Sequence, residues 1–433
     1  MQTILLITVG GSPAPIVTAI RSLNPDRVIF VCSQGPRGSL SQITAEGTPC
    51  EVRRGAEVVA KLPNIPTQVN LGDHFNADDD IILLADPDDL SEAYQLITEK
   101  IRAIRECHPQ AQIYADYTGG TKTMSLALGS AALDFSLTLY LTTSTTRENL
   151  FRVERGQSTS RAITSPVIIE RTLTQDLPRL LEQYNYSGAI STLTALMASY
   201  ELTREQRRRV QALRDRCSGF DAWDRFDHSE AWSYLGLQMQ QVQTYGLALK
   251  RVLSSRASID ADFVPPEAIS GHGYELVKDL LLNTQRRAHQ QRYDDAVGRL
   301  YRALELLAQI HLQQTYKIET GNVDLKQLPE TLRDRYSNEG HDGKIQLALW
   351  KSYSLLSELP DDPVGKHFKD RASHLKNALE VRNYSLFAHG FKPITGSDYT
   401  RFKEVVQTFI ETALSDLILP KARKPFPQFP TIL

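Results

Sequence analysis

The stretch QIYADYTGGTKT, residues 112–123, decides the class of the N-terminal fold. It joins a short apolar run to a loop with two glycines, and residues 122–133 then have the composition of a helix. A strand, a glycine turn and a helix in this order are typical of α/β proteins. Residues 4–9, ILLITV, lead in the same way into a glycine turn at 10–11. The two stretches therefore predict two strands of one parallel sheet.

Further apolar runs at 27–33, 80–85 and 137–143 alternate with helical patterns at 15–23 and 90–107. Continuous apolar strands between helices predict a sheet that is covered on both faces. We therefore expect a doubly wound, Rossmann-like α/β domain. Ligands of such sheets bind where the strands end, which directs attention to the loops after residues 9 and 117.

After Pro166 the strand patterns nearly vanish and helical periodicity continues to about residue 417. A cluster of prolines and glycines at 265–273 is the best boundary within this helical part. We predict an α/β domain at 1–165, a helical linker or insert at 166–270, a helical domain at 271–420 and an extended, proline-rich tail at 421–433.

The chain has 433 residues, of which 41% are hydrophobic and 23% charged, with a net charge of −2. This balance excludes binding to nucleic acid through bulk charge, so any such contact must be local. The cysteines, at 32, 50, 107 and 217, form no C-x-x-C pair, which disfavours a zinc site and a disulfide framework. No leader and no membrane span is expected, because no apolar run is long enough, and we expect a cytoplasmic protein.

The first candidate loop, TVGGSP at 8–13, lacks the G-x-G-x-x-G spacing of a dinucleotide-binding turn. Its tight turn still leaves backbone N–H groups and the Ser12 hydroxyl for a phosphate or a ribose. We name Thr8, Gly10, Gly11 and Ser12 as candidate ligand-binding residues. A purely structural glycine turn is the alternative.

The second candidate loop contains Gly120, Thr121 and Lys122, so a threonine interrupts the G-K pair of a P-loop. Triphosphate hydrolysis of the P-loop kind is therefore disfavoured. Two glycines, a helix N-terminus and a lysine remain a good arrangement for an anion or a nucleotide, with a plain helix entry as the alternative. The candidate ligand-binding residues of this loop are Asp116, Thr118, Gly119, Gly120, Thr121 and Lys122.

The third candidate site is RNYSLFAHG at 382–390, which we expect to close a long amphipathic helix that ends at Gly390. Arg382 and His389 are seven residues apart, so on one helix they would share a face about 10 Å apart along the axis. A histidine exchanges protons near neutral pH, and a guanidinium holds a phosphate and its developing charge. Taken alone, a histidine at a helix end is more often only stabilised by the helix dipole.

These residues resemble the R-x4-6-H signature of HEPN ribonucleases, including the polar residue after the arginine. Residues 293–309, YDDAVGRLYRALELLAQ, are similar to the earlier helix of such domains. The loops at 8–12 and 116–122 are similar to the ligand loops of CARF domains. Their order along the chain is that of the CARF plus HEPN ancillary ribonucleases of type III CRISPR systems. Residues 166–270 match neither motif.

This resemblance implies a homodimer in which two CARF domains together bind one cyclic oligoadenylate, with four adenylates preferred over six. It also implies a composite cleft that cuts single-stranded RNA without a metal ion and leaves a 2′,3′-cyclic phosphate. Arg382 would stabilise the phosphorane, His389 would position the phosphate or transfer a proton, and Asn383 would orient the cleft. Arg302, Glu305 and Ser385 would have supporting roles.

Two other classes of function stay open at this point. The first is a nucleotide sensor without catalysis, whose helical half is a platform for partners. The second is an α/β enzyme that acts on a nucleotide at the Lys122 loop. A mixed case is a ring nuclease, in which Thr118, Thr121 or Lys122 supports slow cleavage of the activator.

Overall fold

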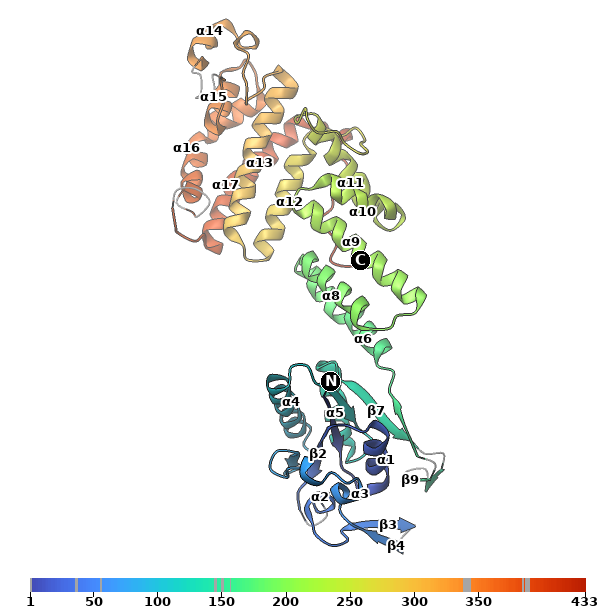
Figure 1. The fold of residues 1–433 in the computed structure, drawn as a ribbon. Helices are drawn as coiled ribbons and strands as arrows, with labels where there is room; N and C mark the ends of the chain where they lie inside the picture. The colour runs from blue at the N-terminus through green and yellow to red at the C-terminus, as the bar shows by residue number, and fades with distance from the viewer. Residues whose placement is uncertain are drawn as a thin grey trace. The chain divides into compact units, whose positions relative to one another are not determined.

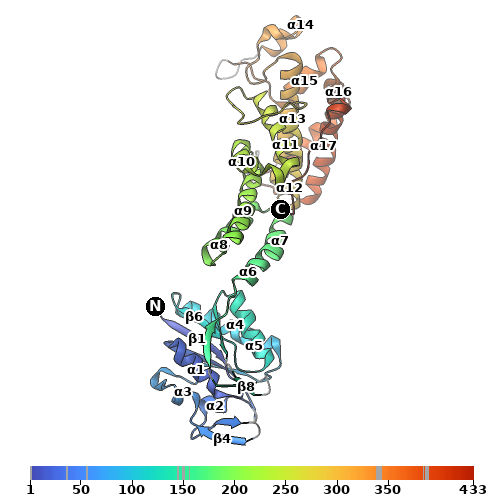
Figure 2. The same ribbon diagram turned by 90° about the vertical axis from the view of Figure 1, so that its right-hand side faces the viewer.

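The computed structural model of the protein describes residues 2–35, 38–54, 57–143, 146–148, 152–155, 157–337, 344–383, 385 and 390–433 (Figures 1 and 2). These residues fall into two compact units, Met1–Glu170 and Arg171–Leu433. The first unit is built on a sheet and the second is helical, as the change of sequence pattern after Pro166 predicts.

The described part of the first unit holds one six-stranded sheet with the strand order β10-β7-β6-β1-β2-β5. Neighbouring strands are parallel except β10, which pairs antiparallel with β7 at the edge. The strands are β1 (Thr3–Thr8), β2 (Arg27–Ser33), β5 (Ile81–Leu84), β6 (Gln112–Asp116), β7 (Thr138–Thr143) and β10 (Ser158–Arg161). Two short antiparallel pairs lie outside this sheet: β3 (Cys50–Arg54) with β4 (Glu57–Leu62), and β8 (Thr146–Glu148) with β9 (Arg152–Arg155).

Helices cover both faces of the sheet. Successive side chains of a strand point to opposite faces, so each central strand contributes to two cores. Leu5 and Ile7 of β1 pack in one core with Ile16 of α1. Ile4 and Leu6 pack in a second core, to which α4 and α5 contribute. The helices of this unit are α1 (Pro13–Leu23), α2 (Ser41–Thr44), α3 (Ile65–Gln68), α4 (Leu90–Cys107) and α5 (Lys122–Asp134). The predicted doubly wound, Rossmann-like fold is confirmed.

The antiparallel edge strand β10 and the β3–β4 hairpin were not predicted. β10 is the polar sequence STSR, and most side chains of β4 are exposed to solvent. Neither has the apolar pattern that burial against a core imposes on a strand. The sheet is therefore mixed, with a parallel centre that carries the two glycine loops.

The second unit consists of helices that stack in pairs. α6 (Ser165–Arg171) leads into it, and the following helices are α7 (Leu177–Glu182), α8 (Tyr186–Ser199), α9 (Arg204–Asp224), α10 (His228–Leu235), α11 (Met239–Ala257), α12 (Glu275–His289), α13 (Tyr293–His311), α14 (Glu330–Arg333), α15 (Leu349–Glu358), α16 (Pro363–Asn383) and α17 (Gly396–Leu417). Short 3-10 turns lie at Gly72–His74, Gly236–Gln238, Leu325–Gln327, Asp334–Tyr336 and Pro420–Ala422, and π turns lie at Thr172–Asp176 and Leu312–Tyr316.

The long helices α12 and α13 form an antiparallel hairpin, and α17 packs along α13 with α16 beside it (Figure 1). Side-chain oxygens of Asn185, Thr203, Asp227 and Thr395 accept the first free N–H groups of the helices that follow them. Such caps fix where each helix begins. This hairpin and the helices α16 and α17 carry the C-terminal candidate site.

The tail after α17 packs against the same unit. Phe429 is buried, and its ring centroid lies 3.6 Å from the guanidinium carbon of Arg286 on α12. The hydroxyl of Tyr186, on α8, donates a hydrogen bond of 2.7 Å to the carbonyl oxygen of Pro430. The tail therefore ties α8 to α12. Among the described helices, none has the length and apolar character that crossing a membrane requires.

Candidate functional site

The two glycine loops lie side by side, because β1 and β6 are parallel neighbours with Ile7 opposite Asp116. The loops touch backbone to backbone. A Cβ atom on Gly10 would lie 2.6 Å from the amide nitrogen of Gly120, and one on Gly119 would collide with the carbonyl oxygen of Thr8. Glycine is required at both positions for this close approach.

Asp116 holds the second loop from inside. Its side chain is fully buried, and its Oδ1 accepts the amide N–H of Thr118 at 2.9 Å while its Oδ2 accepts the Thr142 hydroxyl at 3.1 Å. Burial raises the pKa of Asp116, and these hydrogen bonds oppose the shift. Thr118 in turn accepts the amide of Thr142 at 2.7 Å. Asp116 and Thr118 thus position the loop.

Thr8 and Thr121 are also engaged within the protein. The Thr8 hydroxyl donates to the carbonyl oxygen of Gly119 at 2.7 Å. The Thr121 hydroxyl donates to the carbonyl oxygen of Pro87 at 2.7 Å and accepts the amide of Met124, which caps α5. Gly120 has a φ of +80°, in the region that favours glycine. These contacts fix the turn from which α5 begins.

Three kinds of group remain for a ligand at these loops. Lys122 is exposed, and it forms no ion pair or hydrogen bond with the residues that the structure describes. The Ser12 hydroxyl likewise makes no hydrogen bond within the described chain. The amide groups of Gly11 and Gly120 donate no hydrogen bond to described residues. A cation, a hydroxyl and free N–H groups beside helix N-termini are the donors that bind phosphate oxygens.

One contributor to this site has no signal in the sequence. Gln42, in α2, is nearly buried, and its Nε2 donates a hydrogen bond of 2.6 Å to the carbonyl oxygen of Gly10. Its Oε1 is buried without a partner in the described structure. Gln42 supports the first glycine turn, but a polar residue in a loop after a strand carries no pattern that would single it out.

The C-terminal candidate site is built on α13 and α16. Arg382, in the last turn of α16, is half-buried, and its guanidinium carbon lies 4.4 Å from the ring centroid of Tyr301 on α13. A guanidinium over an aromatic face is attracted by the ring and is held flat against it. Tyr301 lies within the helix that the HEPN resemblance singled out, although it was not named as a site residue.

The prediction that α16 continues to Gly390 is wrong for the described residues, because this helix ends at Asn383. The amide and the hydroxyl of Ser385 both donate to the carbonyl oxygen of Arg382, at 3.0 and 2.7 Å. These bonds close the chain into a turn instead of another helical step. His389 lies outside the described residues, so its pairing with Arg382 stays a prediction that rests on the resemblance.

The other predicted site residues lie on the same two helices. Asn383 is exposed at the end of α16. Arg302, on α13, donates to Glu305 at 2.7 Å and to Gln309 at 2.8 Å. No contact in the described structure joins Arg302 or Glu305 to Arg382, and Tyr301 is the α13 side chain that meets it. The described residues also contain no cluster of three or more histidine, cysteine, aspartate or glutamate side chains arranged to hold a metal ion.

The comparisons with known proteins agree with this architecture. Residues 267–413 match the family model described as the Csm6 HEPN domain. A similar solved structure is Csm6 of Enterococcus italicus bound to cyclic hexa-2′-fluoro-hexa-dAMP. It has a TM-score of 0.54 and 12% sequence identity, over 97% of this chain and 96% of that chain. Comparison with curated protein sequences gives no match.

A Rossmann-like domain with paired glycine loops is followed by a helical unit that contains the match to the HEPN domain, and this is the order of domains in CARF plus HEPN proteins. Residues 267–413 are thus similar to the HEPN domain of Csm6, and the fold of the chain is similar to that of Csm6, in agreement with the family resemblance drawn from its motifs.

Proposed function

We propose that this protein is a ribonuclease of type III CRISPR antiviral defence, switched on by a cyclic oligoadenylate. The observation that carries the proposal is the match of residues 267–413 to the Csm6 HEPN domain, because this range includes both Arg382 and His389. The first unit is the sensor and the HEPN domain cuts single-stranded RNA. The active form is a homodimer, in which each subunit supplies one copy of each site.

The sensor binds the activator at the paired glycine loops. A cyclic oligoadenylate repeats one phosphate per nucleotide, and a two-fold dimer presents two copies of Lys122, Ser12 and the free loop amides. Four adenylates remain the predicted ring size. The hexa-adenylate analogue in the similar structure makes six the alternative that an assay must exclude.

The cleavage step uses the RNA itself as the nucleophile. The ribose 2′-oxygen loses its proton and attacks the adjacent phosphorus, the bond from phosphorus to the 5′-oxygen breaks, and the leaving 5′-oxygen takes a proton. The products are a 2′,3′-cyclic phosphate and a 5′-hydroxyl. Arg382 stabilises the charge that develops on the phosphorane, His389 positions the phosphate or transfers a proton, and no metal ion takes part.

Activation is a shift between two dimer geometries. The activator favours the cutting geometry only to the extent that it binds this geometry more tightly than the resting one. Asn383, which is exposed at the end of α16, orients the cleft by hydrogen bonding.

The test is cleavage of a fluorescent single-stranded RNA in EDTA, with cyclic tetra-adenylate, cyclic hexa-adenylate or no activator. The wild type is compared with His389→Ala and with His374→Ala, a matched control on the exposed face of α16. Mass analysis of the products identifies the cyclic phosphate, and analysis of the activator after the reaction detects any cleavage of the ring.

The proposal predicts cutting that needs an activator, survives EDTA and is lost only in His389→Ala. Binding of an activator without any RNA cleavage would instead indicate a sensor without catalysis. Loss of the activator ring in the His389→Ala protein would add ring nuclease activity at the Lys122 loop.

A further inference from the structure

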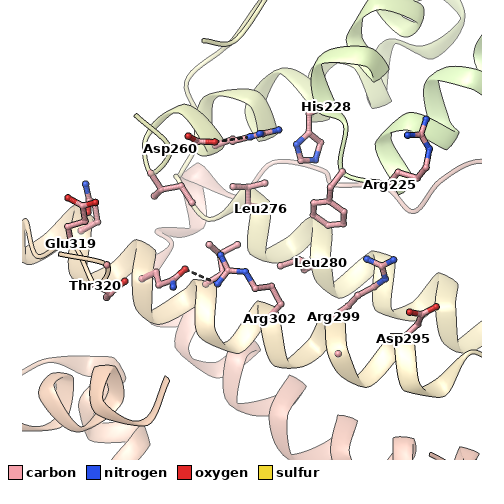
Figure 3. Close-up of a pocket in the computed structure, with 18 residues that line it drawn as sticks. Arg225, His228, Asp260, Leu276, Leu280, Asp295, Arg299, Arg302, Glu319 and Thr320 are labelled. Carbon is pink, nitrogen blue, oxygen red and sulfur yellow. Dashed lines mark hydrogen bonds and ion pairs between the residues drawn. The ribbon is translucent and has the colours of Figure 1, made fainter. Parts of the chain in front are cut away.

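A cavity of about 870 Å³ lies in the second unit, and its lining includes Arg302 but not Arg382 (Figure 3). Its walls come from the joint between α9 and α10, the end of α11, one face each of α12 and α13, and the loop at 319–321. Cavities of about 300–1,000 Å³ are the usual size for binding small molecules and cofactors. The HEPN resemblance gives Arg302 a supporting role, but it assigns no ligand to this cavity.

One end of the cavity carries an unpaired guanidinium. Arg299, on α13, is half-buried and forms no ion pair or hydrogen bond with any described residue, and its Nε is buried without a partner. Its neighbour Asp295 is engaged by Arg292. Burial lowers the pKa of Arg299, and Arg286 and Arg292 lower it further, while Asp295 and Asp279 oppose the shift. A charge that is removed from water without a counter-ion is costly, so an anion at this point would be stabilised.

An unpartnered histidine lines the same cavity. His228, at the start of α10, is only 1% exposed. Its Nε2 lies 3.2 Å from the Oδ2 of Asp279, while its Nδ1 is buried without a partner in the described structure. With Nε2 donating to the carboxylate, Nδ1 is left to accept a hydrogen bond from a ligand hydroxyl. His228 points toward α12 in Figure 3, between Arg225 and Leu276.

The remaining walls differ in character along the cavity. Arg225, Asp295 and Arg299 lie at one end, whereas Asp260, Glu319 and Thr320 lie at the other (Figure 3). Arg225 also donates to the carboxylates of Asp221 and Glu230. Leu276, Leu280 and Arg302 lie between the two ends (Figure 3), and Arg302 is engaged by Glu305 and Gln309. Phe226 and Ile259 add apolar surface to the lining. The matching ligand has an anionic end, a flat apolar body and hydrogen-bond donors at its far end. A nucleoside that bears a phosphate has this order of groups.

We infer that this cavity binds a phosphorylated nucleoside, with the phosphate at Arg299 and Arg225, a ribose hydroxyl at His228 and the base toward Asp260. The nucleotide is either a free monophosphate or the 5′-phosphorylated end of an RNA strand, because both present the same groups. This site is separate from the glycine loops and from Arg382, and it does not depend on RNA cleavage.

Gly298 offers a way to fill the cavity without removing a charge. It lines the cavity within α13, and a Cβ atom at this position meets nothing within 4 Å. Leucine favours a helix over glycine, so Gly298→Leu should fold while its side chain occupies the binding space. Arg299→Gln removes the unpaired charge. Arg401→Gln, at an exposed arginine of α17 that pairs only with Asp398 in the described structure, is the matched control.

The experiment is titration calorimetry of the full chain with the four nucleoside 5′-monophosphates, the four nucleosides and a 5′-phosphorylated RNA trinucleotide, at one fixed ionic strength. We expect a monophosphate to bind about tenfold or more tightly than its nucleoside, since hydrogen bonds to charged groups are the stronger ones. Arg299→Gln should weaken this binding by about tenfold or more. Gly298→Leu should abolish it, and Arg401→Gln should leave it unchanged.

The trinucleotide distinguishes the two sources. Binding of the monophosphate but not of the trinucleotide indicates a free nucleotide, and binding of both indicates an RNA end. The inference is overturned if neither binds. It is also overturned if binding persists in Arg299→Gln and Gly298→Leu but is lost in Lys122→Ala, since the nucleotide then lies at the glycine loops.

Discussion

The contact between the two glycine loops predicts opposite effects for two neighbouring substitutions. In Gly10→Ala the new methyl group would lie 2.6 Å from the amide nitrogen of Gly120, whereas ordinary contact begins near 3.4 Å. The loops must therefore separate by about 0.8 Å. A methyl group on Gly11 meets nothing within 4 Å, which makes Gly11→Ala the matched control.

The size of the effect follows from the contacts that this separation disturbs. Overpacking costs about 1–3 kcal/mol. The hydrogen bonds from Gln42 to Gly10 and from Thr8 to Gly119 contribute about 1 kcal/mol each when intact. Alanine also lowers the conformational entropy of the unfolded chain, which stabilises the folded state by about 0.4–1 kcal/mol and offsets part of this cost. We expect Gly10→Ala to lower the free energy of unfolding of the first unit by about 1–3 kcal/mol, and Gly11→Ala to leave it unchanged or slightly higher.

Differential scanning calorimetry of the full chain measures both variants. A change of 1 kcal/mol shifts the Tm of a domain of this size by about 2–4 °C, so Gly10→Ala should lower the transition of the first unit by about 2–12 °C. The transition of the helical unit should not move. Equal melting temperatures for the two alanine variants would refute the close approach of the loops.

Three further predictions concern the rest of the chain. Asp362 and His311 form a buried pair at 2.6 Å. In urea titrations at pH 7, Asp362→Ala should lower the free energy of unfolding by about 3–5 kcal/mol. The control Asp416→Ala, at the exposed pair with His367, should lower it by less than about 1 kcal/mol. Burial acts to raise the pKa of Asp362, but hydrogen bonds from His311, Gly365 and Tyr316 outweigh it and lower the pKa. The stability that Asp362 provides is therefore present at neutral pH and is lost as the pH falls below 3.8, the ordinary pKa of an aspartate. An equally steep dependence of stability on pH in Asp362→Asn would contradict this. Tyr301→Ala should reduce the rate of RNA cleavage about 3- to 30-fold, because it removes the ring under Arg382. Tyr301→Phe keeps the ring and should keep the activity. Equal rates for the two variants would contradict the role of the ring. A maleimide at pH 8 should modify only Cys107 in the folded protein, because Cys107 is the exposed thiol. Burial raises the pKa of Cys32 and Cys217 to about 12 and that of Cys50 to about 11. Rapid modification of a second thiol would contradict the burial of these three cysteines.

The predictions from the sequence are most accurate for the strands whose apolar side chains are buried in the core. The strand at 27–33 matches β2 residue for residue, and the other central strands differ by one or two residues at their ends. The rule that ligands bind where parallel strands end also directed attention to the two glycine loops, although the sequence did not predict that these loops meet. By contrast, β10 and the β3–β4 hairpin are polar or exposed, and no core imposes a pattern on them.

The candidate sites show where local patterns are insufficient. Leu386 and Phe387 continue the apolar spacing of α16, so the sequence extends the helix, but the turn at Ser385 stops it at Asn383. Tyr301 and Gln42 act through contacts with residues 81 and 32 positions away, respectively, and such contacts leave no local signal. The hydroxyls of the candidate residues Thr8 and Thr121 bond to Gly119 and Pro87, partners that are also distant in sequence and leave no local signal.

The central claim is that an activator at the glycine loops controls cutting at the HEPN domain. The measurement that tests it most directly is the single-turnover rate of RNA cleavage against activator concentration, together with the Kd of the activator, for the wild type, Lys122→Ala, Lys61→Ala and Arg382→Ala. Lys122→Ala should weaken activator binding by about tenfold or more and regain the wild-type rate at saturation, while the exposed control Lys61→Ala should behave as the wild type. Arg382→Ala should bind the activator normally and cut about 100-fold or more slowly at every concentration. Cleavage by the wild type that does not depend on the activator, or an unchanged rate in Arg382→Ala, would contradict the account.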